Sequence, residues 1–143
     1  MIAYHGSTHK LPDDLALLMP SKHGSFGSGF YLGDKAAASL YADSDHLHEF
    51  WVDDSQLLRV DACFEIAEPF DLDTAALPLL ARLFNCSVRD AANVFSRLTC
   101  DGFLLGAEVA ELVQNEGYAG LYLDYGTCFE VVVYPPFDVI KPI

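Results

Sequence analysis

The chain has 143 residues, a length that fits one domain over residues 1–143. Hydrophobic residues make up 52% of the chain, enough for a packed core, and no segment approaches the ~20 apolar residues of a membrane helix. The net charge of −13, from 21 acidic and 8 basic residues, disfavours a broad nucleic-acid interface, because such an interface needs clustered Lys and Arg.

The N-terminal residues show no basic segment followed by an apolar one, so we expect no signal peptide. No Cys-x-x-Cys pair is present among the four cysteines, which are Cys63, Cys86, Cys100 and Cys128. We therefore expect reduced thiols and a cytoplasmic protein. His46 and His48 form a His-x-His pair, but no further ligands stand at zinc-like spacing, so no metal site is expected.

The first part of the chain consists of short apolar segments separated by a loop. Residues 2–5 and 29–33 predict short strands, and residues 11–28 predict a loop because they are rich in Pro, Gly and Ser. Asp34 can cap a helix that runs to about Tyr41, since the residues between them are rich in alanine.

The remainder of the chain shows both kinds of periodicity. Alternating apolar residues in 57–66 predict a half-buried strand. Apolar residues at helical spacing predict helices over 75–84, 88–98 and 104–115, and two strands follow around Tyr125–Gly126. We therefore predict an α+β fold, with strands at both ends of the chain and helices between them.

One carboxylate stands in the most apolar of these segments. CFEVVVYPP, residues 128–136, predicts a buried strand that contains Glu130. Strand alternation places Cys128, Glu130 and Val132 on one face. Burial of a lone carboxylate is costly unless it is paired, protonated or facing a wet cleft. The alternative is an edge strand whose Glu130 points into solvent.

Two further groups have the chemistry to bind a ligand. In YHGS, residues 4–7, His5 stands where a strand meets Gly6, and a glycine lets a ligand approach free backbone groups. The alternative is a surface histidine beside a turn. Tyr31, in a predicted strand, and Tyr41, at the end of the following helix, can sandwich a flat ring. The alternative is two core tyrosines with satisfied hydroxyls.

In this order, YHGS, GSGFYLGDKAAASLYA and FEVVVYPPFDVIKP resemble the His-Tyr-Glu branch of the ADP-ribosyltransferases. That branch includes diphtheria toxin, the poly(ADP-ribose) polymerases and small bacterial and phage domains. VDACFEIAEPFDLD is also similar to the strand that follows the tyrosine-bearing helix in such domains. The resemblance spans nearly the whole chain, and it implies a split, mixed β core around an NAD cleft with helices packed outside.

The resemblance implies a cofactor-binding role for five residues. His5 matches the histidine that hydrogen-bonds the adenosine-side ribose of NAD. Gly6 matches the glycine whose backbone holds the nicotinamide carboxamide, and Ser7 completes this cofactor-binding motif. Tyr31 and Tyr41 match the aromatic residues that stack on the nicotinamide, although their spacing is one residue shorter than in the polymerases.

Glu130 matches the catalytic glutamate. NAD carries a cationic leaving group, so cleavage leaves an oxocarbenium-like ribose that a nearby carboxylate stabilises. Cys128 stands two residues before Glu130, where arginine-modifying transferases usually carry Glu or Gln, and their Ser-Thr-Ser motif is absent. Arginine is therefore disfavoured as the acceptor. The long insertions of the polymerases are also missing, which favours transfer of a single ADP-ribose.

Three functions stay open from the sequence. The favoured one is an NAD-dependent mono-ADP-ribosyltransferase that modifies a macromolecule as a toxin or effector and uses no metal. In an NAD glycohydrolase, water would replace the acceptor. A non-catalytic binding module with a degenerate transferase fold is the third, although Glu130 argues against it. The acidic surface slightly favours a protein acceptor over a nucleic acid, and the sequence leaves open whether an antitoxin or inhibitor partner exists.

Overall fold

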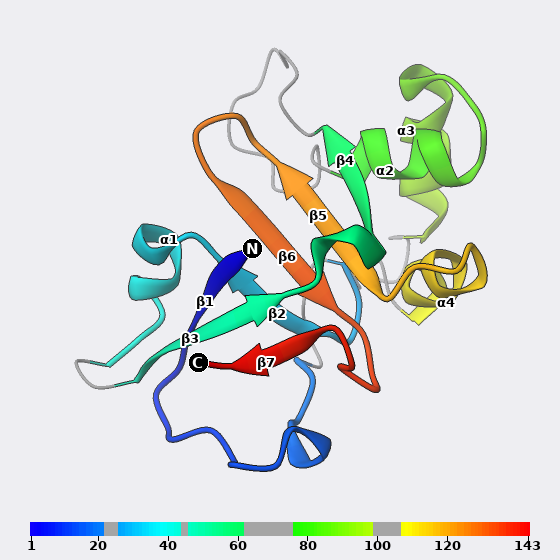
Figure 1. Ribbon diagram of the computed structural model, residues 1–143. Coiled ribbons are helices and arrows are strands. Elements are labelled where there is room, and N and C mark those ends of the chain that lie inside the picture. The colour runs from blue at the N-terminus through cyan, green and yellow to red at the C-terminus, as the bar shows by residue number, and fades with distance from the viewer. Residues whose placement is uncertain (22–25, 44–45, 62–75, 99–106) are drawn as a thin grey trace.

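The computed structural model describes residues 1–21, 26–43, 46–61, 76–98 and 107–143 (Figure 1). Seven strands lie in these ranges: β1 (Ile2–Gly6), β2 (Phe30–Gly33), β3 (Leu47–Val52), β4 (Leu57–Asp61), β5 (Gly120–Asp124), β6 (Phe129–Val133) and β7 (Ile140–Pro142). The helices are α1 (Lys35–Ser39), α2 (Ala76–Leu83), α3 (Val88–Leu98) and α4 (Ala107–Asn115), with short 3-10 turns η1 (Leu15–Leu17) and η2 (Asp54–Gln56).

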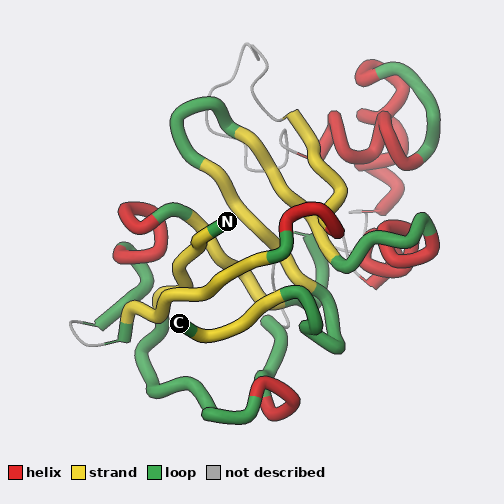
Figure 2. The backbone as a smooth tube through the Cα atoms, in the orientation of Figure 1, coloured by secondary structure: helices red, strands yellow, loops and turns green. Residues whose placement is uncertain are grey.

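The strands form one mixed sheet in the order β4-β5-β6-β2-β1-β3-β7. β4 and β5 are parallel, and every other neighbouring pair is antiparallel. Figure 2 shows the strands in yellow crossing the molecule, with the longer helices at one side. The predicted α+β class and the mixed sheet are therefore confirmed.

The sheet is weakly joined at its centre. β1 and β2 pair at a single register position, Tyr4 with Gly33. In contrast, β1 pairs with β3 from Ile2 to Gly6, and β2 pairs with β6 along its full length. The two parts of the sheet, β4-β5-β6-β2 and β1-β3-β7, therefore diverge from this one point.

The helices pack against the sheet in two separate places. α2, α3 and α4 gather beside β4 and β5, whereas α1 lies against β1 and β2 (Figure 1). Asp34 accepts a hydrogen bond from Ala37 N at 2.9 Å, so the predicted cap of α1 is confirmed. The helix ends at Ser39 rather than near Tyr41, because the next turn tightens.

β6 separates two hydrophobic cores, one on each face of the sheet. Val132 belongs to the core under the helices, which also contains Leu79, Val109 and Leu121. Val131 and Val133 belong to the opposite core. Apolar residues on both faces explain why this strand reads as almost continuously apolar in the sequence.

Most predicted elements are confirmed within the described residues. The strands near 2–5 and 29–33 are β1 and β2, the helix over 88–98 is α3, and the strands flanking Tyr125–Gly126 are β5 and β6. The predicted helices over 75–84 and 104–115 are α2 and α4 where the structure describes them. Two strands were not predicted, namely β3 and β7. Of the predicted strand over 57–66, residues 62–66 lie outside the described residues.

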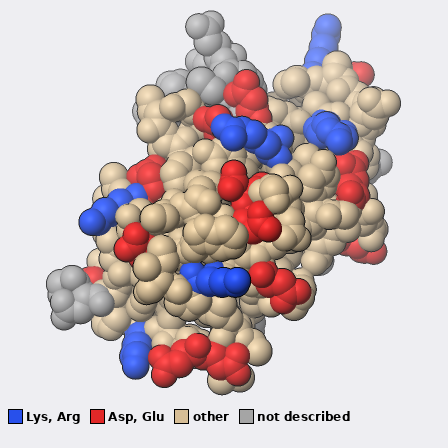
Figure 3. Space-filling view, viewed as in Figure 1, with Lys and Arg blue, Asp and Glu red and all other residues tan. Residues whose placement is uncertain are grey.

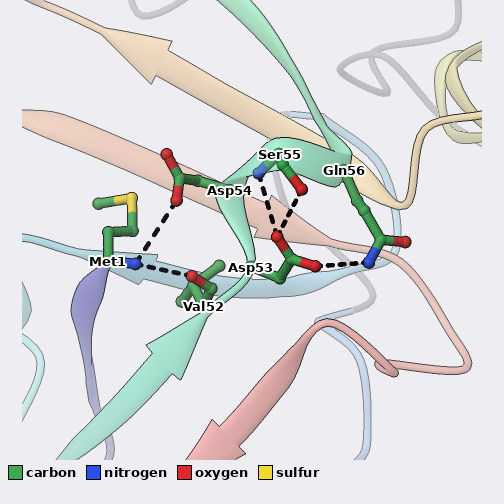
Figure 4. A network of polar contacts seen from close by, with 6 residues as sticks. All are labelled: Met1, Val52, Asp53, Asp54, Ser55 and Gln56. Carbon is green, nitrogen blue, oxygen red and sulfur yellow. Dashed lines mark hydrogen bonds and ion pairs between the residues drawn. The ribbon is translucent and has the colours of Figure 1, made fainter.

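A polar network fixes the turn from β3 to β4 (Figure 4). Asp53 accepts hydrogen bonds from Ser55 Oγ at 2.6 Å and Gln56 Nε2 at 2.7 Å, and these bonds lower the pKa of its carboxyl. The amino group of Met1 donates to the carbonyl of Val52 at 2.8 Å and lies 3.5 Å from Asp54 Oδ1. β1 is thereby tied to the turn that joins the two parts of the sheet.

The charged side chains are spread over the face seen in Figure 3. In Figure 3 acidic and basic side chains form small groups separated by neutral surface, as the dispersed acidity of the sequence predicts. None of the helices in the described ranges has the length and apolar character needed to cross a membrane.

Candidate active site

A cavity of about 850 Å³ lies where β1 and β2 diverge. Its walls come from β1, the loop that follows it, β2, α1 and the hairpin that leads into β6. All six residues that the sequence singled out line this one cavity: His5, Gly6, Ser7, Tyr31, Tyr41 and Glu130. The fold thus brings together three motifs that lie at the two ends of the chain.

His5 is held in one tautomer. Its Nδ1 lies 2.7 Å from the carbonyl oxygen of Tyr31, and because a carbonyl only accepts, Nδ1 carries the hydrogen. Its ring stacks on Phe30 with centroids 4.3 Å apart. Burial lowers the pKa of His5, and the Coulombic interaction with His48 lowers it further, against the opposing effect of the Tyr31 carbonyl. The site therefore favours the neutral imidazole, whose Nε2 is an acceptor.

The packing of the helix explains why position 6 is a glycine, a reason that the sequence did not show. A Cβ at this position would lie 2.0 Å from the carbonyl oxygen of Ala38, so only glycine lets α1 pack against β1. Ser7 follows with its backbone tied on both sides, since its N–H donates to His46 O and its carbonyl accepts from Asp43 N. Gly6 and Ser7 thus contribute a restrained segment of backbone to the cavity wall.

Tyr31 and Tyr41 differ in their surroundings. The Tyr31 hydroxyl accepts from Phe26 N at 2.9 Å and donates to Gly27 O at 2.7 Å, and burial raises its pKa. The alternative of a satisfied core hydroxyl therefore holds for Tyr31, while its residue still lines the cavity. Tyr41 is 73% exposed, so it is no core tyrosine. No ring contact joins these two described residues, and their shared stacking on a ligand stays a prediction.

Glu130 lies in the interior of the sheet. β6 is flanked by β5 and β2, and Glu130 stands opposite Leu123 and Gly33. The alternative of a solvent-facing edge residue is therefore wrong. Burial raises the pKa of the Glu130 carboxyl, and a hydrogen bond from Tyr125 Oη to Oε2, at 3.3 Å, opposes that rise. Within the described ranges no Lys or Arg forms an ion pair with it.

The sequence analysis missed two polar residues of the cavity lining, Tyr125 and Lys10, and one residue beside it, His48. Tyr125 lines the cavity and donates a hydrogen bond to Glu130. Only a tight hairpin separates the two residues in the sequence, and this short spacing is the signal that could have predicted their contact. Lys10 also lines the cavity and is its sole Lys or Arg within the described part of the chain. His48 Nε2 lies 3.3 Å from Ser7 Oγ.

The His46–His48 pair does not belong to a metal site in the described residues. The two rings are tilted with centroids 6.3 Å apart. Across the described ranges, no group of three or more His, Cys, Asp or Glu side chains is placed to hold a metal ion. Cys86 and Cys128 are free thiols, whereas Cys63 and Cys100 lie outside the described residues.

Comparison with known proteins finds one distant structural similarity. No protein-family model and no curated protein matches the chain. One solved structure, described as the crystal structure of an anti-CRISPR protein, is similar with 16% identity and a TM-score of 0.48. The alignment covers 100% of this chain and 95% of that one.

Proposed function

We propose that the chain is an NAD-dependent mono-ADP-ribosyltransferase whose active site is this cavity. One observation carries the proposal: six residues chosen from three separate motifs line a single cavity at the point where the sheet divides. The proposal includes the split β core around an NAD cleft that the resemblance implies. NAD is the substrate, and the proposed chemistry uses no metal.

The chemistry of the cavity suits NAD in four respects. Its volume of about 850 Å³ lies in the range of ~300–1,000 Å³ typical of small-molecule sites. Apolar and aromatic wall residues such as Phe30 and Met19 suit flat rings. His5 Nε2 and the Glu130 carboxylate are acceptors, and ribose offers hydroxyl donors. Lys10 offers a positive charge for a diphosphate.

The proposed reaction needs few protein groups. Nicotinamide leaves as a neutral molecule from a cationic precursor, so no strong general acid is required. The ribose carbon becomes electron-poor as the glycosidic bond breaks, and the Glu130 carboxylate stabilises that charge and accepts a hydrogen bond from the ribose hydroxyl. The acceptor nucleophile then forms a bond to the same carbon and releases its proton to solvent. Burial of Glu130 strengthens this electrostatic effect, because the local dielectric constant is low.

The acceptor is proposed to be a macromolecule, with a protein favoured over a nucleic acid. The net charge of −13 works against approach to a phosphate backbone. Cys128, two residues before Glu130, disfavours arginine as the modified side chain. A toxin or effector acting in the cytoplasm is the biological setting that we propose for such a reaction, with an antitoxin or inhibitor as a further partner to be sought.

The direct test is incubation of the purified protein with NAD, followed by measurement of nicotinamide release. Incubation with labelled NAD in a lysate then identifies the product. Release together with label on a macromolecule supports the transferase. Release without any labelled macromolecule supports a glycohydrolase, and absence of both release and NAD binding contradicts the proposal in favour of a binding module.

His5→Ala is expected to weaken NAD binding by about two- to tenfold, the effect of one hydrogen bond. Affinity in the wild type should also fall as the pH drops through the pKa of His5, because the imidazolium has no acceptor at Nε2. Isothermal titration calorimetry with NAD over a range of pH checks both.

His5→Phe keeps a ring against Phe30 but lacks the acceptor, so it separates packing from ligand binding. It should bind NAD as weakly as His5→Ala. His46→Gln, at a histidine outside the cavity lining, is the matched control and should bind NAD as the wild type does. An unchanged affinity of both His5 variants would remove His5 from the binding site.

A further inference from the structure

We propose that Tyr125 is a positioning residue for Glu130, holding Oε2 so that Oε1 is left for the ligand. The inference rests on the proposed function for its catalytic meaning. Its physical basis is the contact of 3.3 Å from Tyr125 Oη to Glu130 Oε2, together with the rigidity of the hairpin that carries the tyrosine.

The hairpin between β5 and β6 is fixed on both sides of Tyr125. Tyr125 N donates to Cys128 O at 3.0 Å, and Gly126 N donates to Asp124 Oδ1 at 2.9 Å. Gly126 has a φ of 82°, a conformation that favours glycine, so the tight turn suits this residue. Asp124 Oδ2 also accepts from Arg59 at 2.9 Å. The turn therefore presents Tyr125 at a defined place beside β6.

The tyrosine ring is anchored as well as the backbone. Tyr125 is half-buried and packs against the core under the helices, on the face of β6 that carries Val132. Fixing a side chain that is already packed costs little additional entropy. A phenol held in this way can restrain a carboxylate more strictly than a mobile surface group can.

The two carboxylate oxygens of Glu130 are not equivalent. Oε2 accepts from Tyr125, whereas Oε1 has no hydrogen-bond partner among the described residues. Two side-chain atoms in those residues are both buried and unpartnered, Asp34 Oδ2 and His46 Nδ1, and Glu130 Oε1 is not one of them. Oε1 is therefore not completely buried, and it belongs to a residue that lines the cavity. One oxygen is restrained by Tyr125, and the other has no partner among the described residues.

The contact also affects the pKa of Glu130. The titratable groups that interact electrostatically with its carboxylate are Tyr31 from β2 and Tyr125 from the hairpin. The remaining titratable residues of the lining are Tyr4, His5, His9, Lys10, Tyr41 and Cys128. Burial raises the pKa of Glu130, and of all these groups Tyr125 is the one whose hydrogen bond lowers it. Burial also raises the pKa of Tyr125, so its hydroxyl stays a donor.

Tyr125→Phe tests the inference through activity. The acid limb of the pH profile of kcat for nicotinamide release should move to higher pH, because loss of the donor favours the protonated carboxyl. At neutral pH kcat should fall roughly tenfold, the effect of one hydrogen bond to a charged group, while KM for NAD changes less than about twofold. A merely structural role for the ring would not move the acid limb.

A second readout does not depend on catalysis. The carboxyl carbon of Glu130 is followed by NMR during a pH titration of the ligand-free protein, for the wild type and for Tyr125→Phe. The Glu130 pKa should be higher in the variant. Tyr122→Phe is the control: it removes a hydroxyl on β5 that has no hydrogen bond in the described residues, and it should change neither the titration nor the acid limb.

The outcomes separate the inference from the proposed function. Nicotinamide release with an identical Glu130 titration and acid limb in Tyr125→Phe overturns the inference and leaves the function standing. A shifted Glu130 titration in a protein that never cleaves NAD supports the coupling of the two side chains and overturns the proposed function. A thermal melt of Tyr125→Phe confirms that the variant is folded in each comparison.

Discussion

Glu130→Gln is expected to abolish nicotinamide release while leaving NAD binding nearly unchanged. Removal of one preorganised group that stabilises charge in the transition state commonly lowers kcat by ~10²–10³. The amide keeps an oxygen that can accept from Tyr125 and has nearly the same shape, so the cavity should be preserved. Single-turnover measurement of nicotinamide release, with NAD affinity from calorimetry, checks both halves of the expectation.

The same substitution should stabilise the protein at neutral pH. Burial raises the pKa of Glu130 above its ordinary value of 4.5, so the folded state binds the proton more tightly than the unfolded state. The charge therefore costs stability at a pH above the folded pKa, and this cost disappears below the unfolded pKa. Glu130→Gln should raise Tm at neutral pH and leave it nearly unchanged at about pH 4.

Glu49→Gln is the matched control, since Glu49 is an exposed carboxylate on β3 that accepts a hydrogen bond from Tyr4. It should change neither Tm at neutral pH nor nicotinamide release. Undiminished release by Glu130→Gln would contradict the active-site assignment. A Tm that is the same at both pH values would contradict the burial cost. Both effects together would show a carboxylate kept for activity at the expense of stability.

The sequence predicted the members of the site better than their environment. His5, Tyr31 and Glu130 were chosen for their order and neighbours, and all three line one cavity. The partners of these residues come from tertiary pairing that no local pattern contains. The contact between His5 Nδ1 and the Tyr31 carbonyl requires β1 and β2 to lie together, although they pair at one position. The tautomer of His5 therefore could not be predicted.

The two missed strands have local causes. In β3 the segment LHEFWV places His48 and Glu49 next to each other, so the apolar alternation is broken. Its strand character comes from pairing with β1 on one side and β7 on the other. β7 has only the residues Ile140–Pro142 and ends in a proline, which an edge position tolerates. Both strands are therefore determined by long-range pairing more than by propensity.

Gly6 shows how a correct choice of residue can rest on an incomplete reason. The sequence suggested that its missing side chain lets a ligand reach the backbone. In the structure the same space is occupied by the end of α1: a Cβ would meet the carbonyl oxygen of Ala38 at 2.0 Å and the amide nitrogen of Ala42 at 3.0 Å. Tyr41 lies between these two contacts in the chain. Gly6 therefore links the packing of α1 to the position of a proposed stacking residue.

Gly6→Ala is accordingly expected to lower both stability and NAD affinity. The contacted atoms are backbone, so α1 must move away from β1, and overpacking of this kind costs about 1–3 kcal/mol. For a chain of this length, Tm should fall by roughly 3–4 °C per kcal/mol. Displacement of α1 also moves Tyr41, so NAD should bind more weakly than the loss of Tm alone explains. Melts and calorimetric titrations at a temperature where the variant is folded measure the two effects separately.

Gly117→Ala is the control for the stability effect. Gly117 has a φ of 91° and no atom within 4 Å of an added Cβ, so alanine there strains the backbone without a collision. We expect a loss of about 1 kcal/mol with unchanged NAD affinity, because the residue follows α4 and lies outside the cavity lining. If Gly6→Ala melted and bound NAD as the wild type does, α1 would not depend on this glycine. If it lost stability but kept full affinity, α1 would pack through Gly6 without positioning Tyr41 for the ligand.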